Sequence, residues 1–83
     1  MYCVYLLKCD KVGENQFYIG CTSDLRKRIK EHKAGETRTT KNRNPKLIYF
    51  EAFPNKDLAY EREKRLKSSG SVYMALIKRL KLK

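Results

Sequence analysis

Two runs near the N-terminus carry aromatic and β-branched residues at strand-like density. Residues 2–8 are a mixed aromatic and β-branched run, and residues 16–21 contain Phe17, Tyr18 and Ile19, a composition typical of β-strands. The segment between them, residues 10–15, contains Gly13 and Asn15, which accept positive φ angles in a turn. The short separation predicts that the two strands form an antiparallel hairpin.

A helical pattern follows the hairpin. Thr22 or Ser23 is the expected N-cap, Asp24 lies at the positive end of the helix, and Gly35 ends it after about three turns. Leu25 and Ile29 recur with helical spacing and predict the buried side of the helix.

The next segment changes from polar to apolar. Residues 36–44 are polar and basic, which is typical of a loop, and Pro45 closes that loop. Residues 46–53 (KLIYFEAF) are almost uniformly apolar. This composition predicts a strand buried on both faces, and therefore the central strand of the sheet.

Two further helices complete the pattern. Asn55 is the expected cap of a helix from residue 56 to about 69, which Gly70 stops. Residues 71–83 form an amphipathic helix in which Val72, Leu76 and Leu80 share one side. The order ββαβαα predicts one α+β (α/β) domain over residues 1–83, with a small three-stranded antiparallel or mixed sheet flanked by three helices.

Charge narrows the class of partner. The chain has 20 Lys+Arg residues against 9 Asp+Glu, which gives a net charge of +11 on 83 residues. Such an excess attracts polyanions, so nucleic acid is the first candidate partner and an anionic membrane surface the second. A basic surface that serves only solubility remains the simpler alternative.

Other classes are disfavoured by the composition. No apolar run approaches the roughly 20 residues that span a bilayer, and no charged leader precedes an apolar segment. Cys3, Cys9 and Cys21 are odd in number and form no C-x-x-C pair, which argues against a disulfide framework and a zinc site. We therefore expect a cytoplasmic protein with reduced thiols.

Charged residues fall on the apolar sides of two predicted helices. At 100° per residue, Arg28 and His32 lie beside the stripe of the first helix, and the neighbouring cations form its solvent side. In the second helix, Leu58, Ala59 and Leu66 define the stripe, Arg62 lies within it and Glu63 at its margin. A charge on a buried side is costly unless it is paired or binds a ligand. One alternative is a plain ion pair between Arg28 and Glu63.

The ordered set of motifs resembles the GIY-YIG nuclease superfamily. Cys3-Val4-Tyr5 and Tyr18-Ile19-Gly20 match the two tripeptides, and residues 24–29 match the helix that carries the family's arginine, here Arg28. His32 matches a histidine found in many members, and residues 62–67 (REKRLK) resemble the helix that carries the metal-binding glutamate, here Glu63. The chain is most similar in this respect to the small stand-alone members, which resemble the catalytic domain of the excinuclease C subunit.

This resemblance implies a site and a cofactor. One Mg²⁺ or Mn²⁺ ion on Glu63 would assist phosphodiester hydrolysis, because one carboxylate suffices for Mg²⁺ that keeps most of its waters. Arg28 would bind phosphate, and Tyr5 would activate water with help from Tyr18 and His32. The cations expected to contact nucleic acid are Arg26, Lys27, Lys30, Arg38, Lys41, Arg43 and Lys67.

The function that follows is endonucleolytic cleavage of DNA, with branched or damaged DNA as one class of substrate and RNA as another polymer to test. Two alternatives keep nucleic acid as the ligand. One is a non-catalytic nucleic-acid-binding domain on the same fold, and the other is an enzyme that depends on a partner protein for its substrate. A basic scaffold that binds another protein is the third reading, and salt dependence distinguishes it from nucleic-acid binding.

Overall fold

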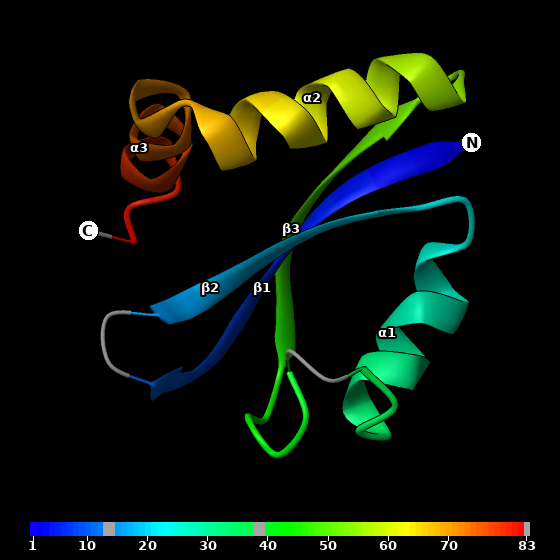
Figure 1. Ribbon diagram of the computed structural model, residues 1–83, viewed down its shortest axis with the longest axis vertical. Helices are drawn as coiled ribbons and strands as arrows, with labels where there is room; N and C mark the ends of the chain where they lie inside the picture. The colour runs from blue at the N-terminus through cyan, green and yellow to red at the C-terminus, as the bar shows by residue number, and fades with distance from the viewer. Residues whose placement is uncertain (13–14, 38–39, 83) are drawn as a thin grey trace.

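The computed structural model describes residues 1–12, 15–37 and 40–82 (Figure 1). The order of elements is ββαβαα, as the hydrophobic pattern predicts. The strands and helices are β1 (Tyr2–Val12), β2 (Asn15–Thr22), α1 (Leu25–Lys33), β3 (Lys46–Phe53), α2 (Lys56–Ser68) and α3 (Gly70–Arg79).

The sheet has the strand order β2-β1-β3, and both strand pairs are antiparallel. The predicted hairpin of β1 and β2 is confirmed, although its strands are longer than the sequence suggested; the predicted turn residues Gly13 and Glu14 lie outside the described part of the chain. Tyr5 lies opposite Gly20 on one side and Phe50 on the other. Tyr5 therefore occupies the middle of the sheet.

The two faces of the sheet pack against different helices. Side chains alternate along β1, so Val4 and Leu6 point to one face while Tyr5 and Leu7 point to the other. The first face packs on α2 and α3, and the second packs on the apolar side of α1. Figure 1 shows this arrangement, with α1 on one side of the sheet and α2 crossing it on the other.

The prediction that residues 46–53 form the central strand is wrong. β3 has the expected bounds but lies at the edge, and β1 is central. Tyr49 and Phe53 pack against the cluster under α2 and α3, whereas Leu47, Ile48 and Phe50 are 36%, 36% and 52% exposed. The other face of β3 is open because α1 covers β1 and β2 and makes few contacts with β3.

The cap of α1 also differs from the prediction. Asp24, not Thr22 or Ser23, is the N-cap, and its carboxylate accepts a hydrogen bond from the backbone N–H of Lys27. The Thr22 hydroxyl instead accepts a bond from the Asp24 N–H at 3.1 Å. Gly35 has a φ of 77°, and α1 ends just before it, as a glycine in the left-handed region favours.

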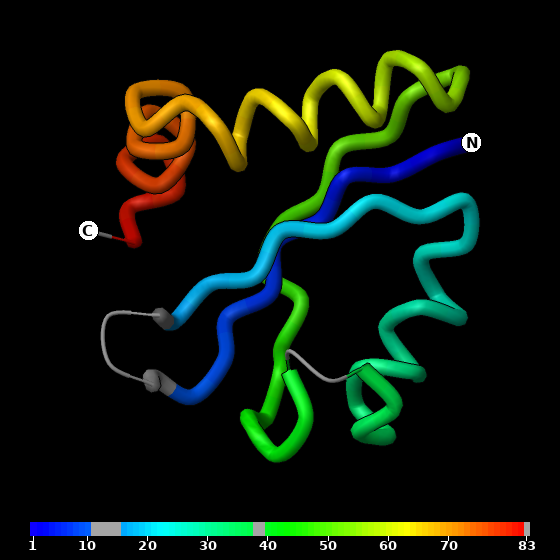
Figure 2. The backbone as a smooth tube through the Cα atoms, viewed as in Figure 1, coloured from blue at the N-terminus to red at the C-terminus, as the bar shows by residue number. Residues whose placement is uncertain are grey.

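Asn55 caps α2 as predicted, and its side chain accepts from the Leu58 N–H. Gly70 does not stop this helix. Ser69 is both the C-cap of α2 and the N-cap of α3, and Gly70 is the first residue of α3. A serine hydroxyl that accepts the Val72 N–H lets a second helix begin at once, so α2 and α3 meet at a sharp corner (Figure 2).

The apolar stripe of α2 is shifted from its predicted position. Ala59 and Leu66 are buried, but Leu58 is 44% exposed. At 100° per residue, Arg62 falls between Leu58 and Ala59. Ala59 and Leu66 point into the core, Arg62 reaches Glu51 from the margin of that stripe, and Leu58 lies further round toward solvent. None of the described helices has the length and apolar character required to cross a bilayer.

Candidate active site

Tyr5 and Gly20 face each other across the β1–β2 pair. Tyr5 is only 1% exposed, and its phenol ring lies directly over the Gly20 Cα. A Cβ atom at residue 20 would collide with the hydroxyl and Cζ of Tyr5. The glycine of the second tripeptide therefore makes room for the tyrosine of the first.

The Tyr5 hydroxyl lies 2.8 Å from Nε2 of His32, which joins the middle of the sheet to α1. Burial raises the pKa of Tyr5 to about 12, while the guanidinium of Arg28 beside the hydroxyl acts in the opposite direction. The phenol is consequently neutral at neutral pH. Its deprotonation requires an adjacent base and further positive charge.

His32 is 1% exposed, as its position on the apolar side of α1 predicts. Burial and the positive charge of Arg28 lower its pKa, and Glu31 acts in the opposite direction. The imidazole is therefore neutral at neutral pH and can accept a proton. Nε2 of His32 lies within hydrogen-bond distance of the Tyr5 hydroxyl, as a general base must lie from the group that it deprotonates.

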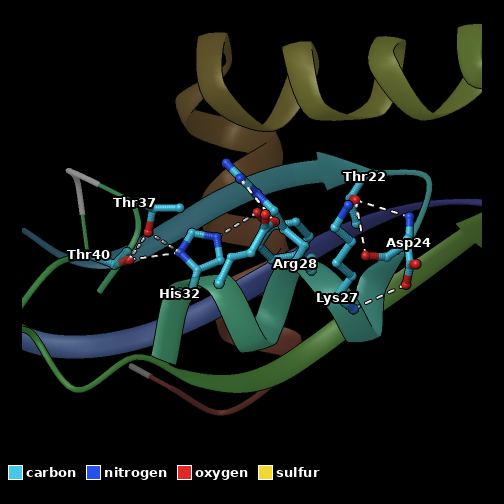
Figure 3. A network of polar contacts seen from close by, with 9 residues as sticks. Thr22, Asp24, Lys27, Arg28, His32, Thr37 and Thr40 are labelled. Carbon is cyan, nitrogen blue, oxygen red and sulfur yellow. Dashed lines mark hydrogen bonds and ion pairs between the residues drawn. The ribbon is translucent and has the colours of Figure 1, made fainter. Parts of the chain in front are cut away.

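Two threonines that the sequence reasoning missed contact the far side of the His32 ring. The hydroxyls of Thr37 and Thr40 each lie 2.7 Å from Nδ1 and 2.6 Å from each other (Figure 3). Thr40 is completely buried. Both residues lie between α1 and β3, in a segment without periodic pattern, and the signal available was a threonine-rich sequence close to the histidine.

Tyr18 completes an aromatic cluster on this face. Its ring centroid lies 6.3 Å from that of Tyr5 and 5.2 Å from that of His32, and the latter pair is edge-to-face. Tyr5 and His32 are also edge-to-face at 5.6 Å. The three rings thus pack against one another in the arrangements that aromatic pairs prefer.

Arg28 lies one turn before His32 on α1, and Figure 3 shows both side chains on the same side of the helix. Its side chain is 36% exposed and forms an ion pair with Glu31 at 3.5 Å. Hydrogen bonding to Tyr5 raises the pKa of Arg28, so the guanidinium stays charged. It thus presents a permanent cation between the buried phenol and solvent.

Glu63 lies on a different element from the other candidate residues. It belongs to α2, which contacts β2 from the other face of the sheet, and its carboxylate binds Lys67 at 3.1 Å. Burial is the main cause of the raised pKa values of the Cys21 thiol and the Tyr5 phenol, and the negative charge of Glu63 raises both further. The Glu63 side chain is 22% exposed and lies on the helix that contacts β1 and β2 from that face.

The alternative of an ion pair between Arg28 and Glu63 is wrong. Arg28 pairs with Glu31 on its own helix, and Glu63 pairs with Lys67 on its own. Each charge is thus balanced locally by an exchangeable surface partner. Both can turn toward a ligand without leaving a buried charge behind.

The expected nucleic-acid contacts fall into four groups, one of which is Lys67, exposed on α2 and paired with Glu63. Arg26, Lys27 and Lys30 are exposed on the solvent side of α1, as predicted, and Lys41 is exposed in the loop before β3. Arg43 donates to the Asp10 carbonyl from Nε at 3.1 Å and from Nη2 at 2.9 Å, so it anchors that loop to β1. Arg38 lies outside the described residues.

Potential metal ligands are sparse. No group of three or more His, Cys, Asp or Glu side chains converges within residues 1–12, 15–37 and 40–82. Cys3, Cys9 and Cys21 are free thiols. The donor set at Glu63 is a single carboxylate, which suits a hard, largely hydrated divalent cation and not a multi-ligand zinc centre.

Comparisons with known proteins give the family that the chain resembles. The family model described as "GIY-YIG catalytic domain" matches residues 1–74. A UPF0213 protein of Clostridium perfringens (strain 13 / Type A) is 46% identical over 66 residues, which are 77% of this chain and 68% of the relative. A UPF0213 protein of Haloquadratum walsbyi is 37% identical over 67 residues, or 78% and 72% of the two chains. No solved structure gives a significant match.

Proposed function

Because this chain belongs to the GIY-YIG family, whose catalytic domain is that of a nuclease superfamily, we propose that it is an endonuclease that hydrolyses phosphodiester bonds in DNA with a divalent metal ion. The observation that carries the proposal is the 2.8 Å contact between the Tyr5 hydroxyl and Nε2 of His32. A neutral buried phenol next to a neutral imidazole is an acid paired with a base, which is the arrangement that a proton transfer requires.

In this proposal Tyr5 takes a proton from the attacking water after His32 has accepted the phenolic proton. The transfer is unfavourable in the resting protein, because the pKa of Tyr5 is about 12 and that of His32 is lowered. The positive charge of Arg28 at the phenol oxygen reduces this difference. Tyr18 keeps both rings in their relative orientation.

Arg28 is the proposed phosphate ligand. Its guanidinium can replace the 3.5 Å contact with Glu31 by a forked pair of hydrogen bonds to two phosphate oxygens. Such a contact would place the scissile phosphate next to Tyr5, since Arg28 lies beside that hydroxyl. It would also stabilise the negative charge that develops on the phosphate during attack.

Glu63 is the proposed ligand of one Mg²⁺ or Mn²⁺ ion. Nucleases of this family generally use a divalent metal. Bound here, the ion would polarise a phosphate oxygen and favour the ionised form of nearby acids. Glu63 must exchange its ion pair with Lys67 for that purpose, and the Lys67 side chain is 52% exposed and free to turn away.

The proposed substrate is DNA, with RNA as a second possible polymer. The net charge of +11 and the exposed cations of α1 support a polyanionic substrate. Phosphate contacts of this kind carry no sequence information. We therefore infer cleavage that depends on DNA structure, or on a partner protein that selects the substrate.

The test is Mg²⁺- and Mn²⁺-dependent cleavage of labelled duplex, single-stranded, flapped and branched DNA and of RNA. Glu63→Gln removes the proposed metal ligand, and Glu61→Gln is its matched control, because Glu61 is an exposed residue of the same helix paired with Arg65 at 3.7 Å. We expect cleavage by the wild type and by Glu61→Gln, and loss of at least about 100-fold in rate for Glu63→Gln. Equal cleavage by both variants would refute the role of Glu63.

Tyr5→Phe tests the second part of the proposal. It removes the hydroxyl that contacts His32 and retains the ring that fills the space over Gly20. We expect a fold-preserving loss of cleavage with unchanged DNA binding. Full activity of Tyr5→Phe together with inactive Glu63→Gln would show that another group activates the water. Salt-sensitive binding by the wild type without any cleavage would favour a binding domain.

A further inference from the structure

The contacts of His32 determine which of its ring nitrogens carries the proton. We propose that Thr37 and Thr40 are positioning residues that hold His32 with its proton on Nδ1, so that Nε2 is free to accept the proton of Tyr5. The inference rests on the proposed function for its catalytic meaning. Its structural content, the tautomer of His32, stands independently of cleavage.

On the Tyr5 side of the ring, the phenolic hydrogen needs an acceptor. The guanidinium of Arg28 carries only donors, so it offers the phenolic hydrogen no acceptor. Among the described residues, the phenolic hydrogen has a single acceptor, Nε2 of His32 at 2.8 Å. If Nε2 carried the proton, it would donate to the phenolic oxygen, and the buried phenolic hydrogen would lose its acceptor, which costs free energy.

On the opposite side of the His32 ring, Nδ1 contacts two threonine hydroxyls. Nδ1 lies 2.7 Å from each threonine hydroxyl, and the hydroxyls are 2.6 Å apart. A proton on Nδ1 allows a directed chain in which Nδ1 donates to Thr40, Thr40 donates to Thr37, and partly buried Thr37 donates to solvent. Every hydrogen in the chain then has a partner, including that of Thr40, which is 0% exposed. The reverse chain, in which Thr40 donates to a bare Nδ1, would satisfy the threonines equally, so the Tyr5 side selects the tautomer and the threonines accept its proton.

The same arrangement serves the charged state. When the Tyr5 O–H bond breaks and the proton binds Nε2, the products are a phenolate and an imidazolium that donates from both nitrogens. Nε2–H then points at the phenolate oxygen and Nδ1–H continues to donate to the threonine pair. No side chain needs to reorient during the transfer, which is the value of preorganisation.

The test uses the fact that His32 is the single histidine of the chain. Its two ring nitrogens are therefore assigned without ambiguity in ¹⁵N NMR spectra of the histidine-labelled protein, and a protonated nitrogen is distinguished from a bare one. We expect the wild type to show a protonated Nδ1 and a bare Nε2 at pH 7. A bare Nδ1 in the wild type would overturn the proposal, whatever the cleavage activity.

Variants connect the tautomer with catalysis. Thr40→Val removes the buried hydroxyl at nearly constant shape, and Thr40→Ser, which keeps the hydroxyl, is the matched control. We expect Thr40→Val to move the proton toward Nε2 and to lower kcat about 10- to 100-fold with little change in KM, while Thr40→Ser retains both properties. If Thr40→Val and Thr37→Val both leave the tautomer and kcat unchanged, the positioning role is refuted.

A second variant and the tautomer measurement cover the cases in which Thr40→Val does not fold or no protein cleaves a substrate. If Thr40→Val fails to fold, Thr37→Val carries the test, because Thr37 is only partly buried. If the wild type has the expected tautomer and the threonine variants change it, but no protein cleaves any substrate, then the proposed function fails and the assignment of the threonines stands. The tautomer measurement thus separates the two failures.

Discussion

Gly20 illustrates how a single atom decides the geometry of the site. A methyl group at this position would occupy the volume of the Tyr5 hydroxyl and Cζ. We expect Gly20→Ala to displace the phenol from Nε2 of His32, to destabilise the fold by about 1–3 kcal/mol through overpacking, and to abolish cleavage. Thermal unfolding and the cleavage assay measure the two effects.

Gly70 is the control for that substitution. A Cβ atom there meets nothing within 4 Å, and Gly70 begins α3. Gly70→Ala should therefore leave cleavage unchanged and alter stability by less than about 1 kcal/mol, since alanine is favoured over glycine in a helix. If both glycine variants behave alike, the close approach of Tyr5 to Gly20 is not what requires glycine there.

The residue scale shows where sequence reasoning succeeds and where it ends. Arg28 and His32 could be placed toward the sheet because a helix repeats every 3.6 residues, so their direction follows from that of Leu25 and Ile29. Thr37 and Thr40 could not be placed, because they lie in irregular chain, where sequence position does not fix direction. Their buried contact with His32 depends on the path of the whole segment.

At the scale of elements, a polar clamp ties β3 to α2 and α3. Arg62 donates to Glu51 from Nε at 3.0 Å and from Nη2 at 3.0 Å, the Tyr49 hydroxyl donates to Glu51 at 2.8 Å, and Arg79 donates to the Tyr49 hydroxyl at 2.8 Å. Burial by itself raises the pKa of Glu51, but the hydrogen bonds from Arg62 and Tyr49 outweigh it and lower the pKa below 4.5. The charge expected on the apolar stripe of α2 is thus explained by a structural partner.

This clamp predicts a pH-dependent contribution to stability. The pKa of Glu51 is lower in the folded state, so its contribution is complete above the ordinary value of 4.5 and is lost as the pH falls through the lowered pKa. At pH 7, Glu51→Gln should reduce the free energy of unfolding by about 2 kcal/mol, a loss of about 10 °C in Tm. Thermal unfolding from pH 7 to pH 2 should show this difference shrink below pH 4.5.

The exposed pair of Glu61 and Arg65 provides the comparison for the clamp. Its side chains are 62% and 68% exposed and lie 3.7 Å apart, so Glu61→Gln should change Tm by no more than a few degrees at any pH. A difference between wild type and Glu51→Gln that stays constant down to pH 2 would mean that the Glu51 charge does not contribute to stability.

The position of β3 shows why elements are easier to predict than their place in a sheet. Its bounds follow from the apolar run between Pro45 and Pro54, and the structure agrees with them. Its burial does not follow, because an apolar composition does not reveal which helix covers which face. α1 covers Leu7 and Tyr5 on β1, and Phe50 opposite Tyr5 remains 52% exposed.

At the scale of the molecule, the cations are distributed unevenly with respect to the candidate site. Lys27 and Lys30 are exposed on α1, the helix that carries Arg28 and His32, whereas Lys78 is exposed on α3. Figure 1 shows α1 and α3 on opposite sides of the sheet. A nucleic acid bound at Arg28 should therefore contact the cations of α1 and leave those of α3 in solvent.

This asymmetry makes the salt dependence of DNA binding a test of the proposed orientation. Binding should weaken linearly with salt on logarithmic axes, and each lost phosphate contact should reduce the slope by about 0.9. We expect the double variant Lys27→Gln/Lys30→Gln to reduce the slope by about 2, and Lys78→Gln to leave it unchanged. Fluorescence anisotropy at several salt concentrations measures both. If only Lys78→Gln reduces the salt slope, the nucleic acid binds on the other side of the sheet, away from Tyr5 and His32. The surface that binds nucleic acid would then be separate from the residues that the proposed proton transfer requires.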